Sequence, residues 1–172
     1  IGDGPDGHSL WPSFTNVPNE FVEAYFPLRV ETYEFIVDSG GAGLHRGGNG
    51  LSVAYRFLVD GHIGIHDDRW LTYPWGVNGG KPGKRSTKLL VRADGREEYI
   101  PAKCEGIKVH KGDLLYFNTW GGGGWGDPLQ RDPTIVVSDV AKKLVSIEGA
   151  KRYGVVINED LSLDQPKTDA LR

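Results

Sequence analysis

A run of four glycines between two tryptophans, in the stretch NTWGGGGWGDP, constrains this chain more than any other feature. Each glycine loses more chain entropy on folding than any other residue, so the fold must offset the cost of the run. Gly121, Gly123 and Gly126 match the G-x-G-x-x-G spacing of a dinucleotide-binding loop. That loop needs its last glycine in the first turn of a helix within a β-α-β unit, and here an Asp-Pro pair comes before any helix. The pattern disfavours a phosphate cradle and leaves a sharp turn of the backbone as the alternative.

Most of the chain before residue 120 has the pattern of β-strands. Runs rich in Val, Ile, Tyr and Phe, bounded by turn residues, are VETYEFIVDSG, GLSVAYRFLVDGHIGIHDDR, STKLLVRADGREEYIPAK and GIKVHKGDLLYFNTW. The Asp-Gly pairs in VDGH and RADGRE predict two hairpins, so the strands that they join are expected to be antiparallel. Residues 1–20 are dense in Gly, Pro, Asn and Ser, which predicts a long ordered loop or a frayed end.

The pattern becomes helical after residue 131. Asp132 and Pro133 form an N-cap and first helical position, and apolar residues follow at helical spacing. Ser146 begins a second, short helix over residues 147–153, and Gly154 is expected in the left-handed conformation behind it. The segment VVI predicts a brief strand, and the polar tail from residue 158 is expected to be exposed.

The expected fold class is mainly β (α+β). An antiparallel β-sandwich or barrel-like domain is expected over residues 1–128, followed by a small two-helix unit over residues 129–172. A chain of 172 residues, 38% of them hydrophobic, is long enough for one domain with a core.

Charge and composition limit the partners and the cellular compartment that are expected. A formal net charge of -3 gives no reason to expect nucleic acid or an anionic membrane as a partner. No apolar run reaches the ~20 residues that span a bilayer. The single cysteine, Cys104, fits a reducing compartment and is expected to be a small buried or half-buried side chain rather than a reactive thiol. A cytoplasmic location is therefore expected.

A second glycine-rich run, DSGGAGLHRGGNG over residues 38–50, combines a carboxylate, a histidine and an arginine. Arg46 could pair with a substrate carboxylate or with Asp38, while backbone amides face an anion. The alternative is a tightly coiled connection between strands in which Arg46 is a structural clamp. The sequence leaves both interpretations open.

The stretch GHIGIHDDRW contains residue types that bind metals, but their spacing in a β-strand does not suit a shared ion. His62 and His66 would lie roughly 13 Å apart in a strand, too far to share an ion. His66 and Asp68 would share one face about 7 Å apart, but an ion would still need a third ligand from elsewhere. We therefore expect no metal site within this chain.

The aromatic residues near strand ends and loops allow two interpretations. They could line a pocket for a ring or a sugar, or pack in the core and at interfaces, which the residue types favour. The set is Trp70, Tyr73, Trp75, Trp120 and Trp125.

Several phrases together resemble the hydantoinase B/5-oxoprolinase family. In this order, they are FTNVPNEFVEAYFP, DSGGAGLHRGGNG, DDRWLTYPWGVNGG, HKGDLLYFNTWGGGGWGDPLQRDP and VSIEGAKRYGVVI. They cover nearly the whole chain, and GGGGWGDPLQRDP is specific to the family. The resemblance implies that this chain is the C-terminal part of a longer subunit, and that the glycine run is a tight loop where backbones meet between the β domain and the helical unit, with Asp127 bonding amides around the turn.

The resemblance also implies a function and its partners. Such subunits pair with an ATP-using hydantoinase A-type subunit, and the complexes hydrolyse cyclic amides such as hydantoins or 5-oxoproline, or carboxylate ketones. ATP phosphorylates the substrate oxygen, and the B-type subunit then hydrolyses or carboxylates the activated compound. ATP and a divalent metal ion are implied for the whole complex, with the metal ligands in the N-terminal part of the subunit and no cofactor within this chain.

The candidate site residues are the charged side chains on or beside the glycine-rich loops. We expect any residues that take part in the chemistry to be Asp38, His45 and Arg46, with Asp68 and Arg69 behind them. Two other functions stay open: a stand-alone β-sandwich module that binds a small ligand through its loop tryptophans, and a structural domain at a subunit interface.

Overall fold

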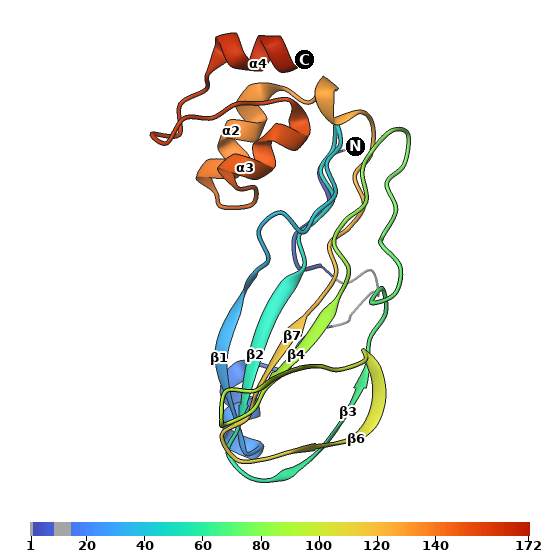
Figure 1. Cartoon of the computed structure of the whole chain (residues 1–172), viewed down its shortest axis with the longest axis vertical. Coiled ribbons are helices and arrows are strands. Elements are labelled where there is room, and N and C mark those ends of the chain that lie inside the picture. The colour runs from blue at the N-terminus through green and yellow to red at the C-terminus, as the bar shows by residue number, and fades with distance from the viewer. Residues whose placement is uncertain (1, 9–14) are drawn as a thin grey trace.

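Seven strands form two antiparallel layers in the part of the chain that the computed structural model describes, residues 2–8 and 15–172. The first layer is a five-stranded sheet in the order β1-β2-β7-β4-β5, and the second pairs β3 with β6 (Figure 1). The strands are β1 (Leu28–Phe35), β2 (Leu51–Phe57), β3 (Gly61–His66), β4 (Thr87–Val91), β5 (Glu97–Tyr99), β6 (Lys103–Val109) and β7 (Leu114–Asn118).

Apolar side chains from both layers form a shared core. Its buried members are Phe57, Ile65, Leu90, Ile100, Val109 and Leu115. Removing such side chains from water is the main force that holds the two layers together. The predicted mainly β, antiparallel fold is confirmed. The described strands do not close into a barrel, because β1 and β5 are the two edges of an open sheet.

One of the two predicted hairpins is confirmed and the other is wrong. The RADGRE turn joins β4 to β5, with Gly95 at φ +87° and the Arg92 amide donating to the Arg96 carbonyl. The VDGH turn instead carries the chain from one layer to the other, since β2 pairs with β1 and β7, whereas β3 pairs with β6. The Asp60 carboxylate accepts from the Lys111 amide, which ties this turn to the β6–β7 connection.

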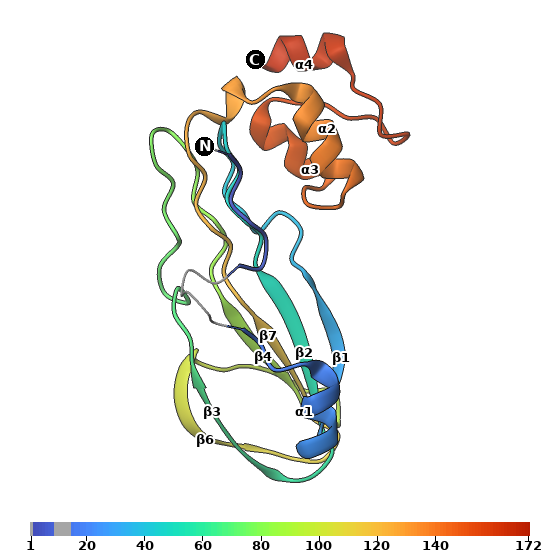
Figure 2. The same ribbon diagram turned by 180° about the vertical axis from the view of Figure 1, so that it is seen from behind.

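Helix α1 (Asn19–Tyr25) lies beside β1 (Figure 2) and was not predicted. Its N-cap is Pro18, without a side-chain cap bond, and none of its residues is buried, so the sequence gives no helical signal there. The Phe21 and Tyr25 rings stack 4.3 Å apart, and the Val30 amide of β1 donates to the Glu23 carboxylate.

The helical unit at the other end of the molecule follows a short 3-10 helix, η1 (Pro128–Gln130) (Figure 1). It contains α2 (Pro133–Ala141), α3 (Ile147–Ala150), a 3-10 helix η2 (Lys151–Tyr153) and α4 (Gln165–Leu171). Asp132 caps α2, Ser146 caps α3, and Gly154 has φ +65°, all as predicted. Within the described residues, no helix combines the length and apolar character needed to cross a membrane.

The end of the chain differs from the prediction. The segment VVI forms an isolated bridge between Ile157 and Leu163 rather than a strand. The tail folds back as α4, where Asp164 caps the helix and buried Thr168 accepts a hydrogen bond from the Val156 amide. The tail is therefore partly packed, because the buried Thr168 hydroxyl and Arg172, which donates to the Tyr153 carbonyl, both tie α4 to the helical unit.

Candidate functional site: the glycine layer and its ion pairs

Three glycine-rich segments run side by side between the strands and the helical unit (Figures 1 and 2). We call residues 38–50, 74–83 and 119–127 the glycine layer. Main-chain hydrogen bonds join the segments directly: the Gly41 amide donates to Gly122, the Gly124 amide to Lys81, and the Lys81 amide to Ala42, at 2.7–2.9 Å. These bonds supply the stabilisation that offsets the entropy cost of the glycines.

Close approach of one backbone to another explains the glycines. A Cβ added to Gly41 would come within 2.7 Å of the Gly124 amide nitrogen, and one added to Gly47 within 2.6 Å of the Gly122 carbonyl carbon. The amides of Gly122 and Gly124 donate to the Gly48 and Lys81 carbonyls within the layer. The expected close meeting of backbones is confirmed.

Asp127 behaves as expected at the end of this run. Its carboxylate accepts a hydrogen bond from the Leu129 amide at 3.0 Å and so caps η1. The side chain holds the turn that leads from the glycine layer into the helical unit.

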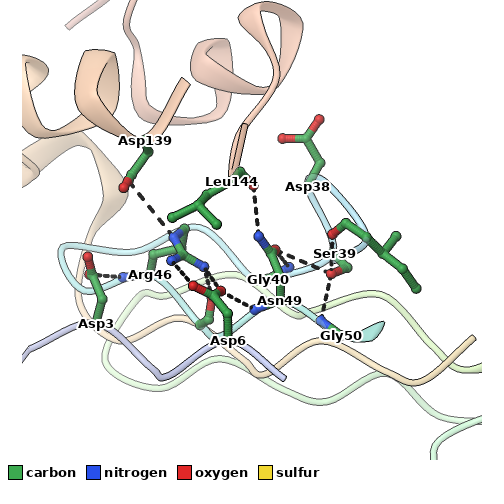
Figure 3. Close-up of polar contacts among 12 residues, drawn as sticks. Asp3, Asp6, Asp38, Ser39, Gly40, Arg46, Asn49, Gly50, Asp139 and Leu144 are labelled. Carbon is green, nitrogen blue, oxygen red and sulfur yellow. Dashed lines mark hydrogen bonds and ion pairs between the residues drawn. The ribbon is translucent and has the colours of Figure 1, made fainter. Parts of the chain in front are cut away.

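Arg46 lies buried at the junction of the layer with the helical unit, with 3% of its surface exposed (Figure 3). Its guanidinium donates to both Asp6 carboxylate oxygens at 2.8 and 3.1 Å and to the Gly47 carbonyl at 2.8 Å. Burial alone would lower the pKa of Arg46, but Asp6 and Asp139 raise it above its ordinary value. Arg46 thus clamps the N-terminal segment and does not pair with Asp38.

A second buried arginine, Arg131, was not singled out from the sequence. It donates to both oxygens of Asp3 at 2.7 Å, to Asp139 at 2.7 Å and to the Leu44 carbonyl at 2.9 Å. Burial opposes ionisation of Asp3, but the hydrogen bond from Arg131 leads the contacts that lower its pKa. The one sign of these buried ion pairs in the sequence is Asp139, an acidic residue on the apolar face of α2.

Asp38 ties the first segment of the layer to the start of α3. It has a left-handed backbone, φ +62°, and its carboxylate accepts from the Ser146 hydroxyl at 2.6 Å and from Arg152 at 2.8 Å. Beside it, Asn49 accepts from the Gly40 amide and donates to the Leu144 carbonyl (Figure 3). These contacts fix the orientation of the helical unit on the layer.

His45 lines a shallow hollow of about 390 Å³ at the same junction. Its backbone bridges Trp125, with hydrogen bonds of 2.9 and 3.0 Å, and its ring lies 5.5 Å from the Trp125 ring. Asp3 and Arg131 line the same hollow. The hollow is therefore lined by His45 beside the Asp3–Arg131 ion pair, whose guanidinium is itself buried.

Asp68 and Arg69 lie elsewhere, after β3. Asp68 forms an exposed ion pair with Lys103 at 2.8 Å, and Arg69 lies 4.6 Å from the centre of the Trp75 ring. Among the described residues, no hydrogen bond or ion pair joins either of them to Asp38, His45 or Arg46. The structure brings the first three candidates to one junction and leaves these two apart.

The His66–Asp68 pair gains no third metal ligand in the described part of the chain. His66 contacts Glu105 at 2.8 Å, and Asp68 is held by Lys103. No group of three or more His, Cys, Asp or Glu side chains is placed there to hold an ion.

A buried lysine at the end of the sheet was also missed by the sequence analysis. Lys88 is 1% exposed and donates to Asp67 at 2.5 Å and to the Asn118 carbonyl at 3.0 Å, above the Phe117 ring. Burial lowers the pKa of Lys88 from its ordinary value, and Asp67 opposes that shift. The pair locks β4 to the end of β3.

Four apolar side chains of the second glycine-rich segment and the residues just before it point to solvent. Leu71, Tyr73, Trp75 and Val77 are 48–66% exposed and occupy every second position of this segment. We call them the exposed row. Arg85 lies over Tyr73, as Arg69 lies over Trp75, so cations flank the row. These aromatic residues are therefore on the surface rather than in the core.

Comparison with known proteins identifies the family. The sequence model of the Hydantoinase B/oxoprolinase family matches residues 1–128. The B-type subunit of a putative D-/L-hydantoinase from a Pseudomonas strain is 33% identical over 99% of this chain, which covers 29% of that protein. The crystal structure of the ATP-dependent caprolactamase from Pseudomonas jessenii matches 88% of this chain and 27% of its own, with a TM-score of 0.77 and 31% identity.

A further solved structure extends the likeness of the fold. Nucleotide-free acetone carboxylase has a TM-score of 0.79 at 21% identity and matches 99% of this chain and 28% of its own. The chain thus spans less than a third of the length of these relatives. The chain belongs to the Hydantoinase B/oxoprolinase family.

Proposed function

We propose that this chain forms the C-terminal part of a hydantoinase B-type subunit in an ATP-dependent enzyme that opens cyclic amides. The observation that carries the proposal is the match to ATP-dependent caprolactamase over 88% of the chain, at 31% identity. We favour hydrolysis of a cyclic amide over carboxylation of a ketone. The relatives that are more than 30% identical to this chain include a hydantoinase subunit and a caprolactamase subunit, whereas acetone carboxylase is 21% identical.

In this proposal, ATP and the metal ion bind outside this chain. ATP binds to a hydantoinase A-type partner and the divalent metal to the N-terminal part of the subunit. The glycine layer is a poor cradle for the phosphates of ATP, since the amides of Gly41, Gly122 and Gly124 already donate to neighbouring carbonyls. Use of ATP and a free thiol at Cys104 both suit the cytoplasm, where we place the enzyme.

Within such an enzyme, the glycine layer serves as a rigid support. Asp38 and Arg46 position the layer through ion pairs, and Asp68 and Arg69 position the loop that follows β3. His45 is the candidate that we propose contacts a ligand, because its half-buried ring lines the hollow.

The exposed row is the surface that we propose meets another polypeptide of the complex. Exposed alternating apolar side chains do not stabilise this chain alone, and Tyr, Trp and Arg are the residues enriched at protein interfaces. This favours the interface interpretation of the loop aromatics over a pocket for a sugar.

Turnover by the assembled enzyme tests the proposed function. The full-length subunit that contains this sequence, produced together with its A-type partner, would be given ATP and one of three substrates: a hydantoin, a lactam or 5-oxoproline. We expect at least one ring to open with consumption of ATP. If the enzyme carboxylated acetone and opened none of the three rings, the cyclic-amide proposal would be wrong and a ketone carboxylase would be favoured.

A pair of histidine variants tests the role of His45 in the same assay. His45→Gln is expected to lower turnover on the order of 100-fold if the imidazole acts on the substrate. The control His62→Gln, at an exposed site on β3, should leave turnover unchanged. Equal activity of the two variants would refute a substrate contact at His45 while leaving the enzyme function intact.

A further inference from the structure

Four buried polar side chains meet where the glycine layer joins the helical unit. Arg46, Arg131, Asp139 and Tyr153 are each at most 5% exposed. Arg131 and Arg46 both face the same Asp139 oxygen, Oδ2, and the Arg131 guanidinium lies 5.8 Å from the centre of the Tyr153 ring. We call these four residues the buried charged cluster.

Three atoms of the cluster lack a hydrogen-bond partner among the described residues. They are Arg46 Nε, Arg131 Nε and the Tyr153 hydroxyl. Buried polar groups of folded proteins nearly always have a partner, either in the protein or in an ordered water. The Arg46 Nε–H and the Tyr153 hydroxyl are therefore candidates for contact with an additional ligand.

The spacing within the cluster suits a single bridging molecule. Arg46 Nε lies 3.9 Å from Asp139 Oδ2, which is too long for a direct hydrogen bond. A water molecule often bridges two polar atoms that lie more than 3.5 Å apart.

We propose that the buried charged cluster holds one ordered water molecule that bridges Arg46 Nε and Asp139 Oδ2, with the Tyr153 hydroxyl as a further partner. The water accepts a hydrogen bond from the arginine N–H and donates one to the carboxylate. It thereby joins the first segment of the glycine layer to α2.

The chemistry of the partners selects water over an ion. An arginine N–H requires an acceptor, which excludes a cation such as ammonium. Three carboxylates, those of Asp3, Asp6 and Asp139, already face the two guanidinium groups. The positive charge of the two guanidinium groups is therefore already compensated before anything binds, so a halide would find no unpaired cation there. Water accepts and donates and adds no charge.

A high-resolution crystal structure of the protein tests the assignment directly. We expect a density peak within about 2.7–3.2 Å of both Arg46 Nε and Asp139 Oδ2. A direct Arg46–Asp139 bond with no peak between them would overturn the proposal. A crystal soaked in bromide distinguishes water from an anion. An anomalous peak at that position would show that the site binds a halide, which would contradict the assignment of water.

The stability of a tyrosine variant gives an independent test in solution. If the Tyr153 hydroxyl bonds the water, Tyr153→Phe lowers the urea midpoint of unfolding, because a satisfied buried hydrogen bond is lost. If the hydroxyl has no partner, the same change is neutral or raises the midpoint, which would contradict its part in the site. Tyr73→Phe, at an exposed ring, is the matched control and should not move the midpoint.

Discussion

Replacement of Gly123 with alanine is expected to destabilise the fold by about 3 kcal/mol, the upper end of the usual cost of overpacking. The new Cβ would overlap the Trp75 carbonyl oxygen and come within 3.1 Å of the Gly76 amide nitrogen. All of the colliding atoms belong to backbone, so no side chain can rotate away, and the segments of the glycine layer would have to separate. Urea unfolding followed by tryptophan fluorescence measures the loss.

Gly61→Ala is the matched control for this change. Gly61 lies in β3, and a Cβ there meets nothing within 4 Å. Its effect is expected to stay within about 1 kcal/mol and to favour the folded state, because alanine costs less chain entropy than glycine in a strand. If both variants unfolded at the same urea concentration, close backbone packing would not be the reason for the glycine run.

Arg131→Met is expected to cost about 3–5 kcal/mol of folding free energy. The change leaves the Asp139 carboxylate buried and without its 2.7 Å partner, and it removes both guanidinium hydrogen bonds to Asp3 of the N-terminal segment. Thermal or urea unfolding at neutral pH measures the loss.

The effect of Arg131→Met is also expected to depend on pH. The folded-state pKa of Asp3 is lowered, so the stability gained from its ion pair is full above the ordinary value of 3.8 and is lost as the pH falls through the lowered pKa. The difference between the variant and the parent chain should therefore shrink at acid pH.

Arg96→Met provides the control at an exposed ion pair. Arg96 pairs with Asp94 at 2.8 Å, but 78% of its side chain is exposed. Surface pairs of this kind contribute little, so the urea midpoint should not move. A midpoint for Arg131→Met as high as that of the Arg96 variant would show that the buried pairs do not hold the junction together.

Local signals in the sequence predicted much of the fold. The Asp132 and Ser146 caps, the left-handed Gly154 and the Asp-Gly turn between β4 and β5 each depend on a few neighbouring residues. Such features are set by local backbone and hydrogen-bond preferences, which is why they could be predicted from short motifs.

Contacts between distant parts of the chain could not be predicted in the same way. The VDGH turn has hairpin chemistry, yet tertiary pairing places β2 and β3 in different layers. Arg131 meets Asp3 across 128 positions of the sequence, and no local pattern marks Arg131 as buried or pairs it with Asp3. The role of Arg46 stayed open for the same reason, since its partner Asp6 lies 40 positions away.

The candidate site, too, could be predicted only in part from the sequence. Charged residues on glycine-rich loops were visible in the sequence, but only the structure separates the junction residues from those after β3. Asp38 and Arg46 are engaged in ion pairs, and the ring of His45 lines the hollow. The proposal that His45 meets a substrate rests on that placement.

Native mass spectrometry of the protein purified from its source tests whether this chain is part of a larger enzyme complex. We expect a large assembly in which this sequence is found together with a hydantoinase A-type polypeptide, and which falls apart into those chains when it is activated in the instrument. A free species with the mass of this 172-residue chain alone would contradict the account and favour a stand-alone module.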